Sequence, residues 1–428
     1  MMTPHFKLPI NLRILATPVL CLGLLISALS SAAFAQQPTK AEKPAKPMKI
    51  ELGTSAAFDA QGRLWLVSKE TDQVDATGKA QYVVLRSSTD LGKTWSAPKR
   101  VQTTPEAISA DGENRPKLAF GNDGAMFIAY TKPLTKPYSG EIRFLRSVDG
   151  GQSFSAPLTV HQHRDEITHR FESMIVDGKG RIFIAWIDKR DLEAAKIRKE
   201  SYRGAAIYVA MSEDNGASFQ PEWKLADHTC ECCRIALSLN ASGAPVAMWR
   251  HIFEPNIRDH AIATLSPTNQ ANMIQRVSFD DWRVDACPHH GPSLAFAADG
   301  ARYQTWFNLK AGEGGVFYAK TDAAGKLSVP LALGSAQASH AEIMVKGSKV
   351  AIVWKEFDGK LTKIAGRFSS DAGKTWLDKK VAATASHSDQ PHLIAHQENM
   401  YLAWQTLAEG MQIVAIDAAA LSNEATKK

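Results

Sequence analysis

An eight-residue pattern, S-x-D-x-G-x-[ST]-[WF], recurs four times and constrains the fold more than any other feature of this 428-residue chain. Its chemistry is that of a tight connection between antiparallel strands: the Asp accepts backbone N–H bonds, the Gly supplies a positive φ, and the terminal aromatic residue plugs between neighbouring strands. Four copies of so specific a pattern predict a repeated β unit. They occupy residues 88–95, 147–154, 212–219 and 369–376.

A second recurring unit consists of an apolar strand, a Gly turn and another apolar strand that ends in an aromatic residue. Clear copies span 118–130, 174–186, 237–249 and 294–306, and weaker copies span 57–65, 344–354 and 393–404. Seven units at a spacing of roughly 50–60 residues match the size of a four-stranded propeller blade. We therefore predict an all-β propeller with seven blades, and six blades as the alternative. The last unit lacks a clear fourth strand, which residues 48–51 could supply.

The eight-residue pattern resembles the Asp-box (BNR) repeat of the sialidase superfamily, and the resemblance covers nearly all of the mature chain. It implies a β-propeller in which each box joins the outer two strands of a blade and has a structural role. The family's reaction also requires a Tyr nucleophile assisted by Glu, an Asp acid/base and a triad of arginines. No tyrosine stands at the start of an inner strand in the late blades, where His340 and Asp389 are found instead. The resemblance therefore supports the fold without the activity.

The N-terminal residues read as an export signal followed by a linker. Lys7 and Arg13 precede an apolar run at 14–29, and an A-x-A cleavage site lies at 33–35. We expect a signal peptide at 1–35, a Lys/Pro/Ala-rich linker at 36–47, the propeller at 48–420 and a tail at 421–428. A cleaved signal predicts a periplasmic or secreted protein whose mature form has no membrane span.

The net charge excludes a nucleic-acid partner. Of the formal +6, Lys7 and Arg13 contribute two, and the four Lys and one Glu of residues 36–50 contribute three. The remaining chain is thus near +1, which is no electrostatic footprint for nucleic acid.

Cys and His residues share one register at the start of the inner strands, counted back from the turn glycines Gly124, Gly180, Gly243 and Gly300. Eleven residues before these glycines stand Glu113, His169, Cys232 and His289, and ten before stand Asn114, Arg170, Cys233 and His290. Cys and His ligands gathered from separate blades suit a soft or borderline metal ion. We predict a copper or zinc site, or a thiol-redox site, formed by Cys232, Cys233, His289, His290 and His169.

A disulfide is the competing interpretation of the cysteines. Exported proteins form disulfides, and the mature part has four cysteines. Cys230 and Cys287 both lie thirteen residues before a turn glycine in adjacent blades, which makes them the candidate pair. Adjacent cysteines bridge each other only with strain, so Cys232 and Cys233 more often bond elsewhere, bind metal or do redox work. The two interpretations are compatible: Cys230 and Cys287 would form a disulfide, and Cys232 and Cys233 would belong to a separate metal or redox site.

Three arginines lie at the mouths of successive blades. Arg115, Arg170 and Arg234 fall nine or ten residues before their turn glycines. Three converging guanidinium groups would bind a carboxylate through charge-assisted bonds, as the arginine triad of sialidases does. The alternative, which we favour, is that they pair with Glu113, Glu172 and Glu231 at the rim of the channel.

These observations leave three classes of function. The first is an exported metal-binding or thiol-redox propeller. The second is an exo-sialidase-type glycoside hydrolase or a glycan-binding protein, with Arg115, Arg170 and Arg234 holding the carboxylate of a small anionic ligand or glycan. The third is a scaffold for a protein partner, in which the cysteines serve only as staples. We rank the first narrowly above the second.

Overall fold

The computed structural model describes residues 50–416, apart from 73, 76–77, 79, 269–272, 287 and 311–313. The predicted signal peptide and linker, Cys287 and the C-terminal tail therefore lie outside the described residues. Within the described part no helix is both long enough and apolar enough to cross a bilayer.

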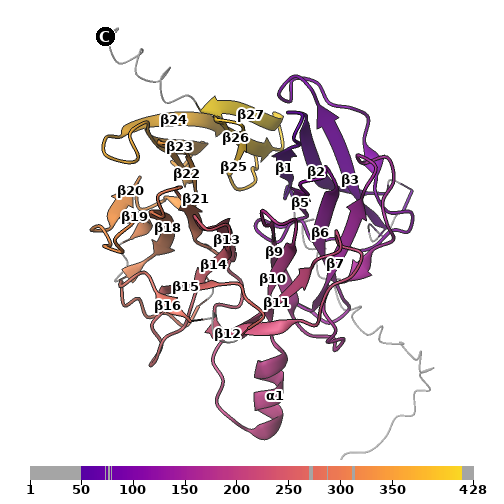
Figure 1. The fold of residues 1–428 in the computed structure, drawn as a ribbon, viewed down its shortest axis with the longest axis horizontal. Helices are drawn as coiled ribbons and strands as arrows, with labels where there is room; N and C mark the ends of the chain where they lie inside the picture. The colour runs from indigo at the N-terminus through magenta and orange to yellow at the C-terminus, as the bar shows by residue number, and fades with distance from the viewer. Residues whose placement is uncertain are drawn as a thin grey trace, which may run out of the picture. The chain divides into compact units, whose positions relative to one another are not determined.

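The described chain forms seven antiparallel sheets arranged as the blades of a propeller (Figure 1). Six sheets have four strands and the last has three. The strands of the first four sheets, in chain order, are β1–β4 (Ser55–Phe58, Leu64–Thr71, Gln81–Ser88, Lys99–Arg100), β5–β8 (Lys117–Phe120, Met126–Pro133, Gly140–Ser147, Leu158–Thr159), β9–β12 (His169–Val176, Ile182–Asp188, Ala205–Ser212, Trp223–Thr229) and β13–β16 (Ala236–Leu239, Pro245–Arg250, His260–Thr264, Gln275–Arg276). The others are β17–β20 (Ser293–Phe296, Arg302–Asn308, Gly315–Thr321, Leu331–Leu333), β21–β24 (Ser339–Lys346, Lys349–Phe357, Thr362–Ser369, Leu377–Thr384) and β25–β27 (His392–His396, Asn399–Thr406, Gly410–Ile416).

The all-β, seven-bladed prediction is thus confirmed, and the six-bladed alternative is wrong. The charged run after β10 forms helix α1 (Arg190–Arg198), which begins with acidic and ends with basic side chains, as the helix dipole favours. Residues 50 and 51 are not in a strand, so within the described residues the fourth strand expected from residues 48–51 is not formed.

The core lies between neighbouring blades, because each sheet buries its two faces against the sheets on either side. Side chains from the second and third blades form one cluster, and side chains from the third and fourth form another. In four blades the aromatic residue that ends the repeated unit is among the largest fully buried side chains. Trp186, Trp249, Trp306 and Trp404 are each at most 1% exposed.

Each Asp box lies between the third and fourth strands of its blade, which confirms the structural role implied by the resemblance. In the first box Asp90 accepts a hydrogen bond from the backbone N–H of Thr94 at 2.9 Å, and Ser88 accepts one from the N–H of Gly92 at 2.8 Å. The same bonds recur in the other three boxes.

Candidate functional site at the channel mouth

All seven inner strands contribute to one central cavity of about 390 Å³. Ser55 on β1, Lys117 on β5 and Ser173 on β9 line it, together with residues of β13, β17, β21 and β25. Several of the residues singled out in the sequence lie in the segments that lead into these strands. Among them, Glu113, Arg115 and Arg234 line the cavity itself.

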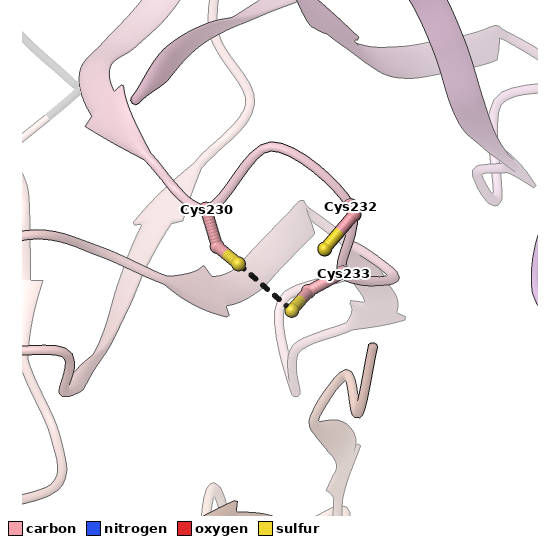
Figure 2. Close-up of side chains that lie close together, drawn as sticks. All are labelled: Cys230, Cys232 and Cys233. Atoms are coloured by element: carbon pink, nitrogen blue, oxygen red, sulfur yellow. Dashed lines mark hydrogen bonds between the residues drawn. The ribbon is translucent and has the colours of Figure 1, made fainter. Parts of the chain in front are cut away.

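Three cysteines form a buried cluster in the connection between β12 and β13 (Figure 2). The sulfur atoms of Cys230, Cys232 and Cys233 all lie within 4.8 Å of one another, and the ring of Phe171 on β9 packs against them. The backbone N–H of Cys230 donates to the carbonyl of Arg250 at 2.9 Å, which fixes the start of the loop against β14. The sequence folds in this way because three cysteines in four residues can share one apolar site only in a tight turn.

Cys230 and Cys233 are free thiols whose Sγ atoms lie 3.0 Å apart. The hydrogen bond from Cys233 is the largest influence on Cys230 and, with help from Arg250, outweighs burial to lower the pKa of Cys230 to about 6. The same hydrogen bond, together with burial, raises the pKa of Cys233 well above its usual range. The contact between the two sulfurs therefore favours the loss of a proton from Cys230 and opposes its loss from Cys233.

The predicted staple is not formed by Cys230. Its side chain turns inward toward Cys233, and it is a free thiol. Cys287, its predicted partner, lies outside the described residues. Cys232 is the disulfide-bonded member of the cluster, so the thiol available as a ligand beside Cys233 is that of Cys230. Register placed the cysteines at one level but could not specify which sulfur faced which neighbour.

The predicted histidines are divided among three environments. His289 is exposed and adopts a φ of +57°. His290 packs its ring against Phe307 and His340, with ring centroids 4.1 and 4.4 Å away. Burial lowers the pKa of His290 to about 3, and its Nδ1 has no hydrogen-bond partner among the described residues.

His169 belongs to a separate group of histidines that the sequence analysis did not single out. Its Nε2 lies 3.2 Å from Nδ1 of His163, its ring stacks on His161 at 4.0 Å, and its Nδ1 contacts the carbonyl of Gly140. The signal was present as an H-x-H pair at 161 and 163, six residues before His169. The predicted set is thus only partly assembled, around its cysteines.

The three arginines do not converge as a free triad. Arg115 is buried and pairs with Asp389 at 2.5 Å, and Arg234 pairs with Glu113 at 3.2 Å. Arg170 lies over the ring of Phe171 at 5.1 Å. The favoured alternative, in which the arginines are held in ion pairs, describes Arg115 and Arg234, although Asp389 of the last blade was not among the expected partners.

Arg250 is the further residue at this site that the sequence analysis missed. It is fully buried at the end of β14, and its guanidinium donates to the carbonyls of His290 at 2.9 Å and Phe307 at 2.8 Å. The available signal was its position directly after Trp249, where an arginine ends an otherwise apolar strand.

Comparison with known proteins agrees with this architecture. Residues 32–266, more than half of the chain, match the family described as "BNR repeat-like domain". No curated protein matches. Similar solved structures include the polysaccharide lyase Uly1 (9% identity, 86% of this chain and 90% of that chain, TM-score 0.55) and a PL25 ulvan lyase bound to -[GlcA(1-4)Rha3S]- (10% identity, 87% and 98%, TM-score 0.52).

A microbial sialidase, Hz136, aligns at 12% identity over 79% of this chain and 74% of its own, with a TM-score of 0.47. At these identities the structural likeness concerns the fold alone. The family match over more than half of the chain, together with the four Asp boxes and the seven blades, identifies the chain as a β-propeller member of the BNR repeat-like domain family.

Proposed function

We propose that this protein is an exported propeller that binds a soft metal ion, copper or zinc, through the thiolates of Cys230 and Cys233 at the mouth of its channel. The single observation that carries the proposal is the buried pair of free thiols whose sulfurs lie 3.0 Å apart. Thiolates are the ligands preferred by copper(I) and zinc, and a thiol must lose its proton before it binds.

The distance between the sulfur atoms of Cys230 and Cys233 lies between the distance found in a disulfide and the distance between two sulfurs bound to one metal ion. A disulfide requires about 2.05 Å, whereas two sulfurs bound to one tetrahedral ion at about 2.3 Å lie roughly 3.8 Å apart. Either state needs a displacement of less than about 1 Å from the observed 3.0 Å.

Burial favours the ion over thiol–disulfide exchange. Cys230 is 1% exposed and Cys233 is 3% exposed. Exchange requires a partner thiolate to attack one sulfur directly, and reactive cysteines are accordingly partly exposed. A small ion needs a much narrower path, so metal binding is the better use of this pair.

Metal analysis of protein purified from the periplasm without chelator tests the proposal. We expect about one copper or zinc ion per chain, and its loss in both Cys230→Ser and Cys233→Ser. His289→Ala is the matched control, because this exposed side chain lies in the same register outside the sulfur cluster.

Retention of stoichiometric metal in both serine variants would reject the proposal. Loss of metal in the control alone would move the site to the histidines. A mass lower by two hydrogen atoms without metal would indicate a Cys230–Cys233 disulfide and a redox role.

Export is part of the same proposal and has its own test. The charged, apolar and A-x-A segments of residues 1–35 support a cleaved leader. The mature protein should begin at Gln36 and be released with the periplasmic or secreted fraction, as N-terminal sequencing would determine. An intact N-terminus in the cytoplasmic fraction would contradict it.

The cavity favours a second candidate function, which is the binding of an acidic glycan or another small anion. Its volume of about 390 Å³ falls within the range of ligand sites. Lys117 lines the cavity, and its ammonium group donates two hydrogen bonds within the described residues, to the carbonyls of Glu113 and Arg115. An ammonium group has three N–H donors, so the third can bind an oxygen of the ligand.

Calorimetric titration with uronate and neutral oligosaccharides tests this second function. Binding of the acidic sugar alone, weakened in Lys117→Met and kept in the exposed control Lys179→Met, would support it. Absence of binding to either sugar would remove it.

A further inference from the structure

One register position of the propeller is apolar in six blades and charged in the fifth. It is the residue of the second strand that lies opposite the last residue of the third strand. In the fifth blade this residue is Arg302, which pairs with Thr321. In the other six blades it is a buried apolar residue: Leu64, Met126, Ile182, Val246, Val350 and Met400.

The fifth blade also lacks an Asp box, and with it the aromatic residue that fills the gap to the preceding blade. In the third blade this residue is Phe219, whose ring meets that of Phe144 in the second blade edge-on, with centroids 5.0 Å apart. Leu327 occupies the same register in the fifth blade, because in both blades the next residue donates its N–H to the carbonyl of the penultimate residue of the third strand. A pocket of about 430 Å³, lined by Arg302 and Leu327, lies here between the fourth and fifth blades.

The guanidinium of Arg302 is held in this pocket by neutral groups. Its Nε donates to Oε1 of Gln304 at 2.9 Å, and its Nη2 donates to Oγ1 of Thr321 at 2.8 Å. The amide of the fully buried Gln304 donates in turn to the carbonyl of Val277 in the fourth blade at 2.7 Å, which keeps its oxygen toward Arg302. These bonds use two of the five N–H donors of a guanidinium. Among the described residues Arg302 has no carboxylate partner, and burial lowers its pKa.

The other charged residues that line the pocket, Arg276 and Asp322, do not neutralise Arg302. Arg276 is paired with both Asp259 and Asp281. Asp322 is exposed, and its Oδ1 accepts two backbone N–H bonds, at 3.0 and 2.8 Å, within its own turn. Solvent and salt screen an exposed carboxylate, whereas a half-buried guanidinium keeps most of its attraction for an anion that reaches it directly.

The rest of the pocket is largely apolar. Val277, Phe296 and Leu327 line it, and Phe279 lies at its rim with 62% of its surface exposed. The volume of about 430 Å³ is within the range of small-molecule sites, which combine apolar walls with a few fixed polar groups. One fixed cation beside apolar walls suits a ligand with one anionic end and one apolar end.

We propose that the pocket between the fourth and fifth blades binds a small aromatic carboxylate. The carboxylate accepts hydrogen bonds from the remaining donors of Arg302, and the ring occupies the place that the aromatic residue of an Asp box fills in other blades. This site is separate from the central channel, and the inference does not depend on the proposed metal ion.

Calorimetric titration of the purified protein with benzoate, and with benzyl alcohol as its neutral counterpart, tests the inference. We expect one benzoate per chain, bound at least about tenfold more tightly than benzyl alcohol, because a charge-assisted bond is made only by the acid. Arg302→Met introduces a side chain that the second and last blades carry at this position, so the variant should fold. Its affinity for benzoate should fall by about tenfold or more. Arg63→Met, which changes an exposed arginine of the first blade, is the matched control and should bind as the wild type does.

Leu327→Trp provides a second variant that keeps the charge. Its ring should fill the pocket as the box aromatic does elsewhere, and benzoate binding should weaken although Arg302 is present. Absence of benzoate binding to the wild type, equal binding of benzyl alcohol, or an affinity unchanged in either folded variant would overturn the inference. Loss of benzoate binding in Lys117→Met would place the ligand in the central channel and would also overturn it.

Discussion

Glycine positions in the turns show how much a single residue can cost in this fold. Gly180, between β9 and β10, and Gly216, in the third Asp box, have similar φ values of +79° and +74°. A Cβ on Gly180 would meet no atom within 4 Å, whereas one on Gly216 would lie 2.5 Å from a ring carbon of Phe144. The two positions share a backbone requirement and differ in packing.

This difference predicts unequal effects of the same substitution. Gly180→Ala should lower the free energy of unfolding by about 1 kcal/mol, the cost of a left-handed conformation for an L-residue. Gly216→Ala should lower it by about 2–4 kcal/mol, because displacing the Phe144 ring adds overpacking strain to the same cost. Urea unfolding monitored by tryptophan fluorescence measures both. Equal losses in the two variants would contradict the packing argument.

The candidate site was predictable from the sequence only in part. Counting from the turn glycines put the cysteines just before an inner strand, and the structure places Cys230, Cys232 and Cys233 together in the connection between β12 and β13. The count could not show that Cys230 faces Cys233, since this depends on side-chain rotation within the loop after β12. It could not give Arg250 a role either, because Arg250 reaches the site from β14, which belongs to a different part of the repeat.

At the scale of the element, the Asp box is a self-contained hydrogen-bonded loop. Asp90 accepts bonds from the hydroxyl of Thr94 at 2.6 Å, the N–H of Thr94 and the hydroxyl of Ser88. The bond from the Thr94 hydroxyl is the largest of the causes that lower the pKa of Asp90 from 3.8 to about 2. These bonds are local in sequence, which is why the pattern alone predicted the position of every box.

The lowered pKa predicts a pH dependence with a definite sign. Because the folded-state pKa of Asp90 lies below its unfolded value of 3.8, its ionised form stabilises the folded protein above about pH 4, and this contribution is lost as the pH falls toward about 2. Asp90→Asn should therefore be less stable than the wild type at pH 6, and the two should converge near pH 2. Urea unfolding at several pH values provides the comparison. A constant difference down to pH 2 would exclude this role of the carboxylate.

The blade count also follows from element-scale signals, with one exception. Seven apolar strand pairs gave seven blades because the sequence period of each strand pair is local. The expected fourth strand of the last blade was wrong for residues 50 and 51 because pairing between distant segments leaves no local signature. Those two residues lead into β1 in an irregular conformation, so the described chain closes its ring by other contacts.

At the scale of the whole propeller, one buried ion pair connects the two ends of the ring. Asp389, just before β25 in the last blade, accepts a hydrogen bond from the backbone N–H of Thr54 before β1 and pairs with Arg115 before β5. Arg115 also donates to the carbonyl of Thr54 at 2.9 Å. Three blades, the first, second and last, thus meet at a single pair of side chains. A carboxylate-binding role for Arg115 would require this connection to break.

Removing one partner of this pair should therefore destabilise the whole ring. The side chains of Arg115 and Asp389 are 7% and 2% exposed, so Asp389→Ala leaves a buried guanidinium without its counter-charge. We expect the free energy of unfolding to fall by about 3–5 kcal/mol, and the double variant Arg115→Met/Asp389→Leu to recover most of that loss, because an apolar pair needs no counter-charge. Urea unfolding followed by circular dichroism gives both values. A loss below about 1 kcal/mol in Asp389→Ala would show that the pair is dispensable for closure, and a double variant as unstable as the single one would show that the two charges act separately.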